Sequence, residues 1–159
     1  MMSERQLNIV EDHVDDAKRL GAKVLCGGAR TTGLFYPPTV MTGITTDMKV
    51  FQEETFGPVL PIITFDTIDD AISIANNCQY GLSGGVLTNN MEMAFHITNR
   101  LDTGMVHIGN GTVMDDPCGC AFGGVKNSGL GRESGKYSYE ALTELKWVTV
   151  HHKKPGFPF

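Results

Sequence analysis

Short apolar runs alternate with amphipathic helical segments along most of the chain, and this alternation limits the folds that it can adopt. The first helix is predicted from apolar residues at helical spacing, which are Leu7, Val10, Val14 and Ala17. Residues 23–26 then predict a short strand, and the mostly apolar run 59–65 is typical of a buried strand. Strands that alternate with short helices favour an α/β domain with a mostly parallel sheet and flanking helices.

The alternation continues through the middle of the chain. Thr67, followed three residues later by Asp70, predicts the start of a helix. A run over 82–87 predicts a strand that contains glycines, and Asn90 is a candidate cap for the helix that follows it. Residues 105–108 predict the next strand. The same strand–helix order therefore holds in both halves of the chain.

Other segments depart from this order. The two prolines within 36–41 make it an edge strand or a segment outside the ladder, because proline has no amide hydrogen to donate. Residues 109–132 hold seven glycines and no sustained periodicity, and a long irregular segment inside a domain is usually functional or disordered. A helix is predicted over 134–142, and the alternating residues 144–150 predict the last strand.

The composition excludes several functional classes. The chain has 159 residues and a net charge of −5, so it has no broad basic field for nucleic acid. No apolar run approaches membrane-spanning length, and residues 1–5 lack the apolar core of a secretion signal. We therefore expect a cytoplasmic protein with reduced cysteines, and neither nucleic acid nor a membrane as its partner.

The cysteines do not form a metal-ligand pattern. Cys118 and Cys120 are separated by one glycine, with no second pair and no nearby histidine, whereas a structural zinc site needs four ligands. Buried or loop thiols are the simpler interpretation, and no metal site is expected. A new nucleophile at Cys118 or Cys120 ranks last among the alternatives, because no partner base is visible beside either thiol.

A pair of adjacent glutamates, Glu53 and Glu54, precedes the turn Phe56-Gly57-Pro58. In an extended chain the two carboxylates point to opposite faces, so only one of them can look into a given site. Such a carboxylate can accept hydrogen bonds from two neighbouring hydroxyls of a sugar. The simpler alternative is two solvated glutamates before a turn, and composition alone favours it.

A second segment, Phe122-Gly123-Gly124, would let the backbone approach a ligand or another chain closely. The glycines that follow at 129–131 do not make a dinucleotide-binding fingerprint, because a third glycine and an immediately preceding strand are missing. The segment therefore predicts a close-approach loop rather than a phosphate cradle.

Four motifs, in their order and spacing, resemble the aldehyde dehydrogenase superfamily. They are EETFGP at 53–58, ANNCQYGLSGGVLT at 75–88, TGMVHIGNGT at 103–112 and FGGVKNSGLGRESG at 122–135. The resemblance implies the C-terminal part of the family's catalytic domain over 1–142, followed by an oligomerisation strand and tail over 143–159. The segment 104–135 and the final Pro158-Phe159 look most like benzaldehyde or vanillin dehydrogenases.

The resemblance also implies roles for individual residues. The family oxidises an aldehyde to a carboxylic acid with NAD or NADP as the hydride acceptor. By motif, Glu54 matches the carboxylate that holds the nicotinamide ribose, and Phe56 matches the ring that packs beside the nicotinamide. Phe122 matches an aromatic wall of the aldehyde pocket, and 110–121 matches the mouth of the substrate tunnel. Residues 145–150 match a strand of the oligomerisation surface, which implies a homo-oligomer.

The resemblance also implies catalytic groups that these motifs do not contain. The family's catalytic cysteine, its glutamate base, its oxyanion-hole asparagine and its dinucleotide-binding domain are all expected upstream of the matched segments. We therefore expect no catalytic residue in this chain, no dehydrogenase activity from the chain alone, and an N-terminal part as a possible partner. The alternative is a non-enzymatic module that self-associates or binds a partner through the family's subunit surface.

Overall fold

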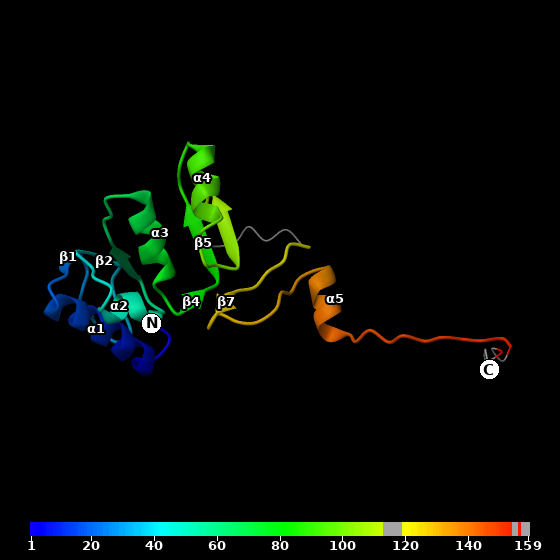
Figure 1. Cartoon of the computed structure of the whole chain (residues 1–159). Helices are drawn as coiled ribbons and strands as arrows, with labels where there is room; N and C mark the ends of the chain where they lie inside the picture. Colours follow the sequence, from blue (N-terminus) through cyan, green and yellow to red (C-terminus); the bar gives the residue numbers. More distant parts are fainter. Residues whose placement is uncertain (113–118, 154–155, 157–159) are drawn as a thin grey trace.

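The computed structural model describes residues 1–112, 119–153 and 156 (Figure 1). Within these residues the helices are α1 (Glu4–Arg19), α2 (Lys49–Gln52), α3 (Ile68–Asn76), α4 (Met91–Thr98) and α5 (Lys136–Leu142). The strands are β1 (Lys23–Cys26), β2 (Thr39–Thr42), β3 (Val59–Ile62), β4 (Tyr80–Gly81), β5 (Ser83–Val86), β6 (Met105–Ile108) and β7 (Val125–Lys126). The α/β class is confirmed, and none of the described helices is long and apolar enough to cross a membrane.

The strands form small mixed sheets rather than one mostly parallel sheet. β1, β2 and β3 make a three-stranded sheet in which β1–β2 is antiparallel and β2–β3 is parallel. β5 pairs with β6 in parallel, whereas β4 and β7 are antiparallel. The connections explain the difference. A helix lies between the strands of each parallel pair, α2 in one and α4 in the other, whereas an irregular loop returns β1 to β2.

The prediction that 36–41 is an edge strand or lies outside the ladder is wrong. β2 is the central strand of its sheet, with β1 on one side and β3 on the other. The prolines do not prevent this, because Pro38 lies just before Thr39, the first residue of the ladder. The amide of Thr39 is free to donate to Pro58 O at 2.7 Å.

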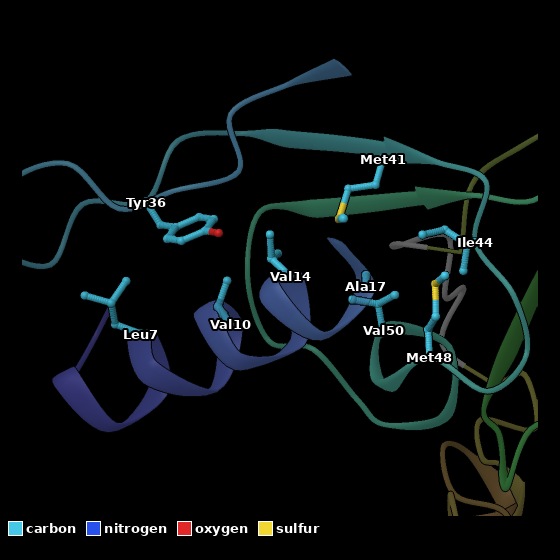
Figure 2. Packing of buried hydrophobic residues seen from close by; sticks show 9 residues of the cluster. All are labelled: Leu7, Val10, Val14, Ala17, Tyr36, Met41, Ile44, Met48 and Val50. Carbon is cyan, nitrogen blue, oxygen red and sulfur yellow. The ribbon is translucent and has the colours of Figure 1, made fainter. Parts of the chain in front are cut away.

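The main core lies between α1 and this first sheet (Figure 2). The four apolar residues that predicted α1 are fully buried, which confirms the periodicity. In Figure 2 the apolar face of α1 lies against Tyr36 and Met41, with Val50 of α2 at its side. Ser3 begins the helix, because its Oγ accepts from Gln6 N at 3.2 Å. α1 is thereby a rigid platform against which other segments can be placed.

Both predicted caps in the middle of the chain are confirmed. Thr67 Oγ1 accepts from Asp70 N at 3.1 Å, and Asp70 Oδ2 accepts from Thr67 N at 3.1 Å, so the two residues form a capping box on α3. Asn90 Oδ1 accepts from Met93 N at 3.0 Å at the start of α4. These bonds are local, which is why the sequence pattern predicts them.

Two predicted strands differ from the structure. The run 59–65 was expected to be buried, yet Leu60 is 58% exposed on the face of β3 that α1 does not cover. The strand expected over 144–150 does not form in this structure, and its large apolar side chains, including Trp147, are exposed. Figure 1 shows this segment running out from α5, and a strand needs a neighbouring strand for its hydrogen bonds.

Candidate functional site

The segment that contains the two adjacent glutamates links α2 to β3; it starts extended at Glu53 and turns at Phe56, where the Gly57 amide donates to Thr55 O at 2.8 Å. Glu53, the C-cap of α2, has φ −114° and ψ 152°. Successive side chains of an extended chain point to opposite sides. Glu53 and Thr55 both contact His13 of α1, although the side chain of Glu53 is 55% exposed, and Glu54 and Phe56 are exposed as well. The prediction that the two glutamates face opposite ways stays a prediction, because both side chains are exposed.

α1 anchors the inner side of this segment. His13 is only 2% exposed, and its Nδ1 shares a hydrogen bond of 2.7 Å with Thr55 Oγ1. Its Nε2 lies 3.4 Å from Glu53 Oε2. Further along, Gln6 Nε2 donates to Phe56 O at 3.1 Å. Gly57 then packs so closely on α1 that an added Cβ would lie 2.5 Å from Val10 Cγ2, so only glycine fits at this position.

His13 was missed as a candidate residue at the level of sequence. The one signal that could have found it is its position in the helical pattern, between Val10 and Val14 on the buried side of α1. A histidine at such a position is buried, and a buried polar side chain needs hydrogen-bond partners. The identity of those partners could not be read from the pattern, since they lie about forty residues away in the chain.

A second polar contact fixes the start of α2, which leads into the same segment. Asp16 of α1 is 9% exposed, and its Oδ2 accepts from Lys49 N, at the first turn of α2, at 2.9 Å. This backbone hydrogen bond lowers the pKa of Asp16, with the Arg19 guanidinium as a further cause. Lys49 Nζ also donates to Asp12 Oδ2 at 2.6 Å, and that bond raises the pKa of Lys49.

The segment also borders an open hollow of about 800 Å³. Its lining residues are Met1, Met2, Ser3, Gln6, Thr55, Phe56 and Gly57. An exposed carboxylate and an exposed aromatic ring two residues apart fit the chemistry of a nicotinamide nucleotide. The carboxylate can accept from the ribose hydroxyls, and the ring offers a flat apolar face. Glu54 precedes Thr55 in the chain and is exposed, but it is not one of the residues that line the hollow.

Phe122, the predicted wall of an aldehyde pocket, lies in a different hollow. It forms an isolated antiparallel bridge with Glu133, in which the Phe122 amide donates to Glu133 O at 3.0 Å. Phe122 and the neighbouring glycines line a hollow of about 300 Å³. The following Gly123 packs against Gly104, where an added Cβ would lie 1.9 Å from Gly123 O. The predicted close approach of backbone is therefore an approach to this chain itself.

The glycine-rich motif is hydrogen-bonded to the segment that precedes β5. Lys126 Nζ donates to Asn76 O at 2.9 Å and to Cys78 O at 3.1 Å, near the C-terminal end of α3. Asn127 N donates to Gln79 O at 3.0 Å, and Gln79 Nε2 donates to Gln52 O at 3.3 Å. A chain of polar contacts therefore runs from the loop after Phe122 to the residue that precedes Glu53.

The three cysteines that the structure describes do not line either hollow. Cys26, Cys78 and Cys120 are free thiols, and Cys120 is exposed. Cys118 and half of the predicted tunnel mouth, residues 113–118, lie outside the described residues. Among residues 1–112, 119–153 and 156, no three side chains of His, Cys, Asp or Glu are grouped as the ligands of a metal ion would be.

Comparison with known proteins places this arrangement in a family. The model of the aldehyde dehydrogenase family matches residues 1–148. A benzaldehyde dehydrogenase of Bacillus subtilis is 40% identical over the whole chain, and a mitochondrial succinate-semialdehyde dehydrogenase of Rattus norvegicus is 40% identical over 93% of it. The crystal structure of an NAD-dependent aldehyde dehydrogenase from Sinorhizobium meliloti superimposes with a TM-score of 0.91 over the whole chain, at 39% identity.

The match covers only part of each of these proteins. The chain spans 32% of the benzaldehyde dehydrogenase, 28% of the succinate-semialdehyde dehydrogenase and 32% of the crystallised enzyme. The chain is equally identical to two enzymes whose names give different substrates, so sequence identity does not favour either substrate for this chain. Because the family model matches nearly the whole chain and the fold is shared, the chain belongs to the aldehyde dehydrogenase family.

Proposed function

We propose that this chain is the C-terminal part of an aldehyde dehydrogenase catalytic domain and that its segment 53–57 positions NAD or NADP. Glu54 accepts hydrogen bonds from the nicotinamide ribose, and Phe56 packs beside the nicotinamide. The observation that supports this assignment is the alternation along the segment. His13 contacts Thr55, which is half-buried, and Glu53, which is still 55% exposed, whereas Glu54 and Phe56 are exposed.

The aldehyde side of the site is assigned to the loop around Phe122. Its ring is the wall of the pocket, and residues 1–142 are the part of the catalytic domain that carries both loops. The relative named as a benzaldehyde dehydrogenase supports an aromatic aldehyde as the substrate. The polar contacts through Gln79 and Gln52 support a shared framework, since they join the loop after Phe122 to the cofactor segment.

We propose that the chain alone does not turn over aldehydes. The reaction needs a thiolate that attacks the aldehyde and a base that activates water, and the bound cofactor supplies the hydride acceptor. Glu54, Phe56 and Phe122 are assigned to binding and orienting the cofactor and the aldehyde, and none of them is a nucleophile. When a covalent catalyst is missing, only the effects of binding and electrostatics remain.

The proposal predicts weak but localised binding of the cofactor. NADH added to the isotopically labelled chain should shift the amide resonances of 53–57, and Glu54→Gln should weaken this binding about tenfold, since a hydrogen bond to a charged group is lost. Glu140→Gln, an exposed change in α5, is the matched control and should bind as the unaltered chain does. Equal binding by the Glu54 variant, or aldehyde-dependent NADH formation by the chain alone, would contradict the proposal.

A second candidate function is a self-associating module without enzymatic activity. The observation that favours it is the apolar segment after α5, whose exposed side chains are Leu145, Trp147, Val148 and Val150. Such a segment can add as a strand to the edge of another sheet. The two candidates differ in the cofactor titration, because the module alone gives no localised shift at 53–57.

A further inference from the structure

We propose that His13 is a positioning residue that decides which side of segment 53–57 is presented to the cofactor. It lies on α1, and both of its ring nitrogens face the inner side of that segment, toward Thr55 Oγ1 at 2.7 Å and Glu53 Oε2 at 3.4 Å. At 2% exposure the ring is held by the core around it. The inference rests on the proposed function, since it assigns Glu54 and Phe56 to the cofactor.

The need for such a residue follows from the sequence of the segment itself. Glu53 and Glu54 are identical, so the pair alone does not determine which carboxylate points outward. In an extended chain, a slip of one residue moves every side chain to the other face. That slip would turn Glu54 toward His13 in place of Glu53 and would move the Thr55 hydroxyl away from the ring. The hydroxyl of Thr55 marks the inner face, because its bond to His13 forms in only one of the two arrangements.

Two further contacts of α1 also hold the segment in place, but they do not replace the contact between His13 and Thr55. Gln6 Nε2 donates to Phe56 O at 3.1 Å, and Gly57 lies against Val10. Both hold backbone atoms or a residue without a side chain, so they set the distance of the segment from α1. Among these contacts of α1, those of His13 reach side chains of the segment. His13 therefore controls which face is outward, and Gln6 and Val10 control how closely the segment lies.

The test is amide hydrogen exchange of the ligand-free chain. The Gly57 amide, which donates to Thr55 O at 2.8 Å, reports the segment, and the amides of β2 report the whole fold. Thr55→Val removes the hydroxyl and keeps the shape. It should speed exchange at Gly57 about tenfold, as expected for the loss of one part-buried hydrogen bond, and leave β2 unchanged. Thr55→Ser restores a hydroxyl and should restore the slow exchange.

Substitutions of His13 test the same hydrogen bond through its other partner. Asn places an amide group near the position of Nδ1, whereas Gln places one near Nε2. His13→Asn should therefore keep the contact with Thr55 and the slow exchange at Gly57, and His13→Gln should lose both. Should the His13 variants unfold, the Thr55 pair alone still decides the question.

Two results would overturn the assignment. One is an unchanged rate of amide exchange at Gly57 in Thr55→Val. The other is an equal increase of the exchange rate at Gly57 and throughout β2, which would indicate that the contact contributes to overall stability alone. Neither result depends on the nucleotide. A failure of the cofactor titration with intact protection at Gly57 would reject the proposed function and keep the positioning by His13.

Discussion

Glu53 and Glu54 are chemically identical neighbours, yet the fold gives them different surroundings. Both side chains are exposed, but Glu53 Oε2 lies 3.4 Å from the buried ring of His13. The difference arises from the extended backbone between α2 and β3, which turns successive side chains to opposite sides. At the scale of single residues, the candidate cofactor site is therefore defined by what α1 binds on the inner side of the segment.

Asp16 carries a prediction at this scale. Its pKa is lowered in the folded chain by the Lys49 amide, so the ionised carboxylate stabilises the fold at pH values above the ordinary pKa of 3.8. As the pH falls below that value and through the folded pKa, this contribution disappears. Asp16→Asn should lower the free energy of unfolding at pH 7, and the difference from the unaltered chain should shrink below pH 3.8.

Denaturant unfolding across this pH range measures the effect. Asp66→Asn, an exposed change in the turn before α3, is the control and should leave the pH dependence as it is. A deficit of the Asp16 variant that stays constant from neutral to acid pH would contradict the assignment, because it would show that charge plays no part.

At the scale of elements, the two helices that separate parallel strands explain the mixed sheets. α2 brings β3 back in parallel with β2, and α4 does the same for β5 and β6. The helix α3 both begins and ends at specific polar contacts. The capping box lies at its start, and Lys126 of the glycine-rich motif donates to carbonyl groups near the end of the same helix.

The capping box gives a prediction for α3. Thr67→Ala removes the Oγ1 that accepts from Asp70 N, and this should lower the free energy of unfolding by about 1 kcal/mol. Ser73→Ala, on the exposed side of the same helix, is the matched control and should be neutral or slightly stabilising, since alanine favours a helix. Thermal and denaturant unfolding compare the two variants. Equal effects of both changes would refute a specific role for the cap.

At the scale of the whole molecule, the chain exposes much more surface than a compact protein of its size. Its accessible surface is 11471 Å² for 17.3 kDa, whereas a compact monomer of that mass exposes about 7,800 Å². Part of the excess is apolar, as on the open face of β3 and along 145–150. Apolar surface of this extent is normally covered by another chain or segment, which supports association.

The only tryptophan of the chain makes association measurable. Trp147 is 89% exposed, so its emission should shift to the blue and the sedimentation coefficient should rise as the protein concentration increases. Leu145→Gln should weaken association about tenfold or more, because burial of a leucine side chain is lost. Lys146→Gln, a neighbouring polar change, is the control. A monomer at high concentration, with unshifted emission, would contradict the prediction.

The parts of the fold that could be read in advance depend on neighbouring residues. The helix α1 follows from the spacing of Leu7, Val10 and Val14, and the caps at Thr67 and Asn90 follow from hydrogen bonds that span three residues. The family could be recognised because its four motifs keep their order and spacing, and the match to residues 1–148 confirms it. The roles of Glu54, Phe56 and Phe122 stay predictions.

Other features depend on contacts between distant parts of the chain, and no local pattern contains them. The central place of β2 needed both β1 and β3 to be located, and the burial of β3 depended on which of its faces α1 covers. The bond between His13 and Thr55 joins residues 42 positions apart. Amino-acid sequence alone therefore determined the α/β class, the helix caps and the family, because short-range hydrogen bonds and periodicity specify them. Packing of α1 against the 53–57 segment decided that Glu53 and Thr55 lie beside His13, because this contact joins residues far apart in the chain.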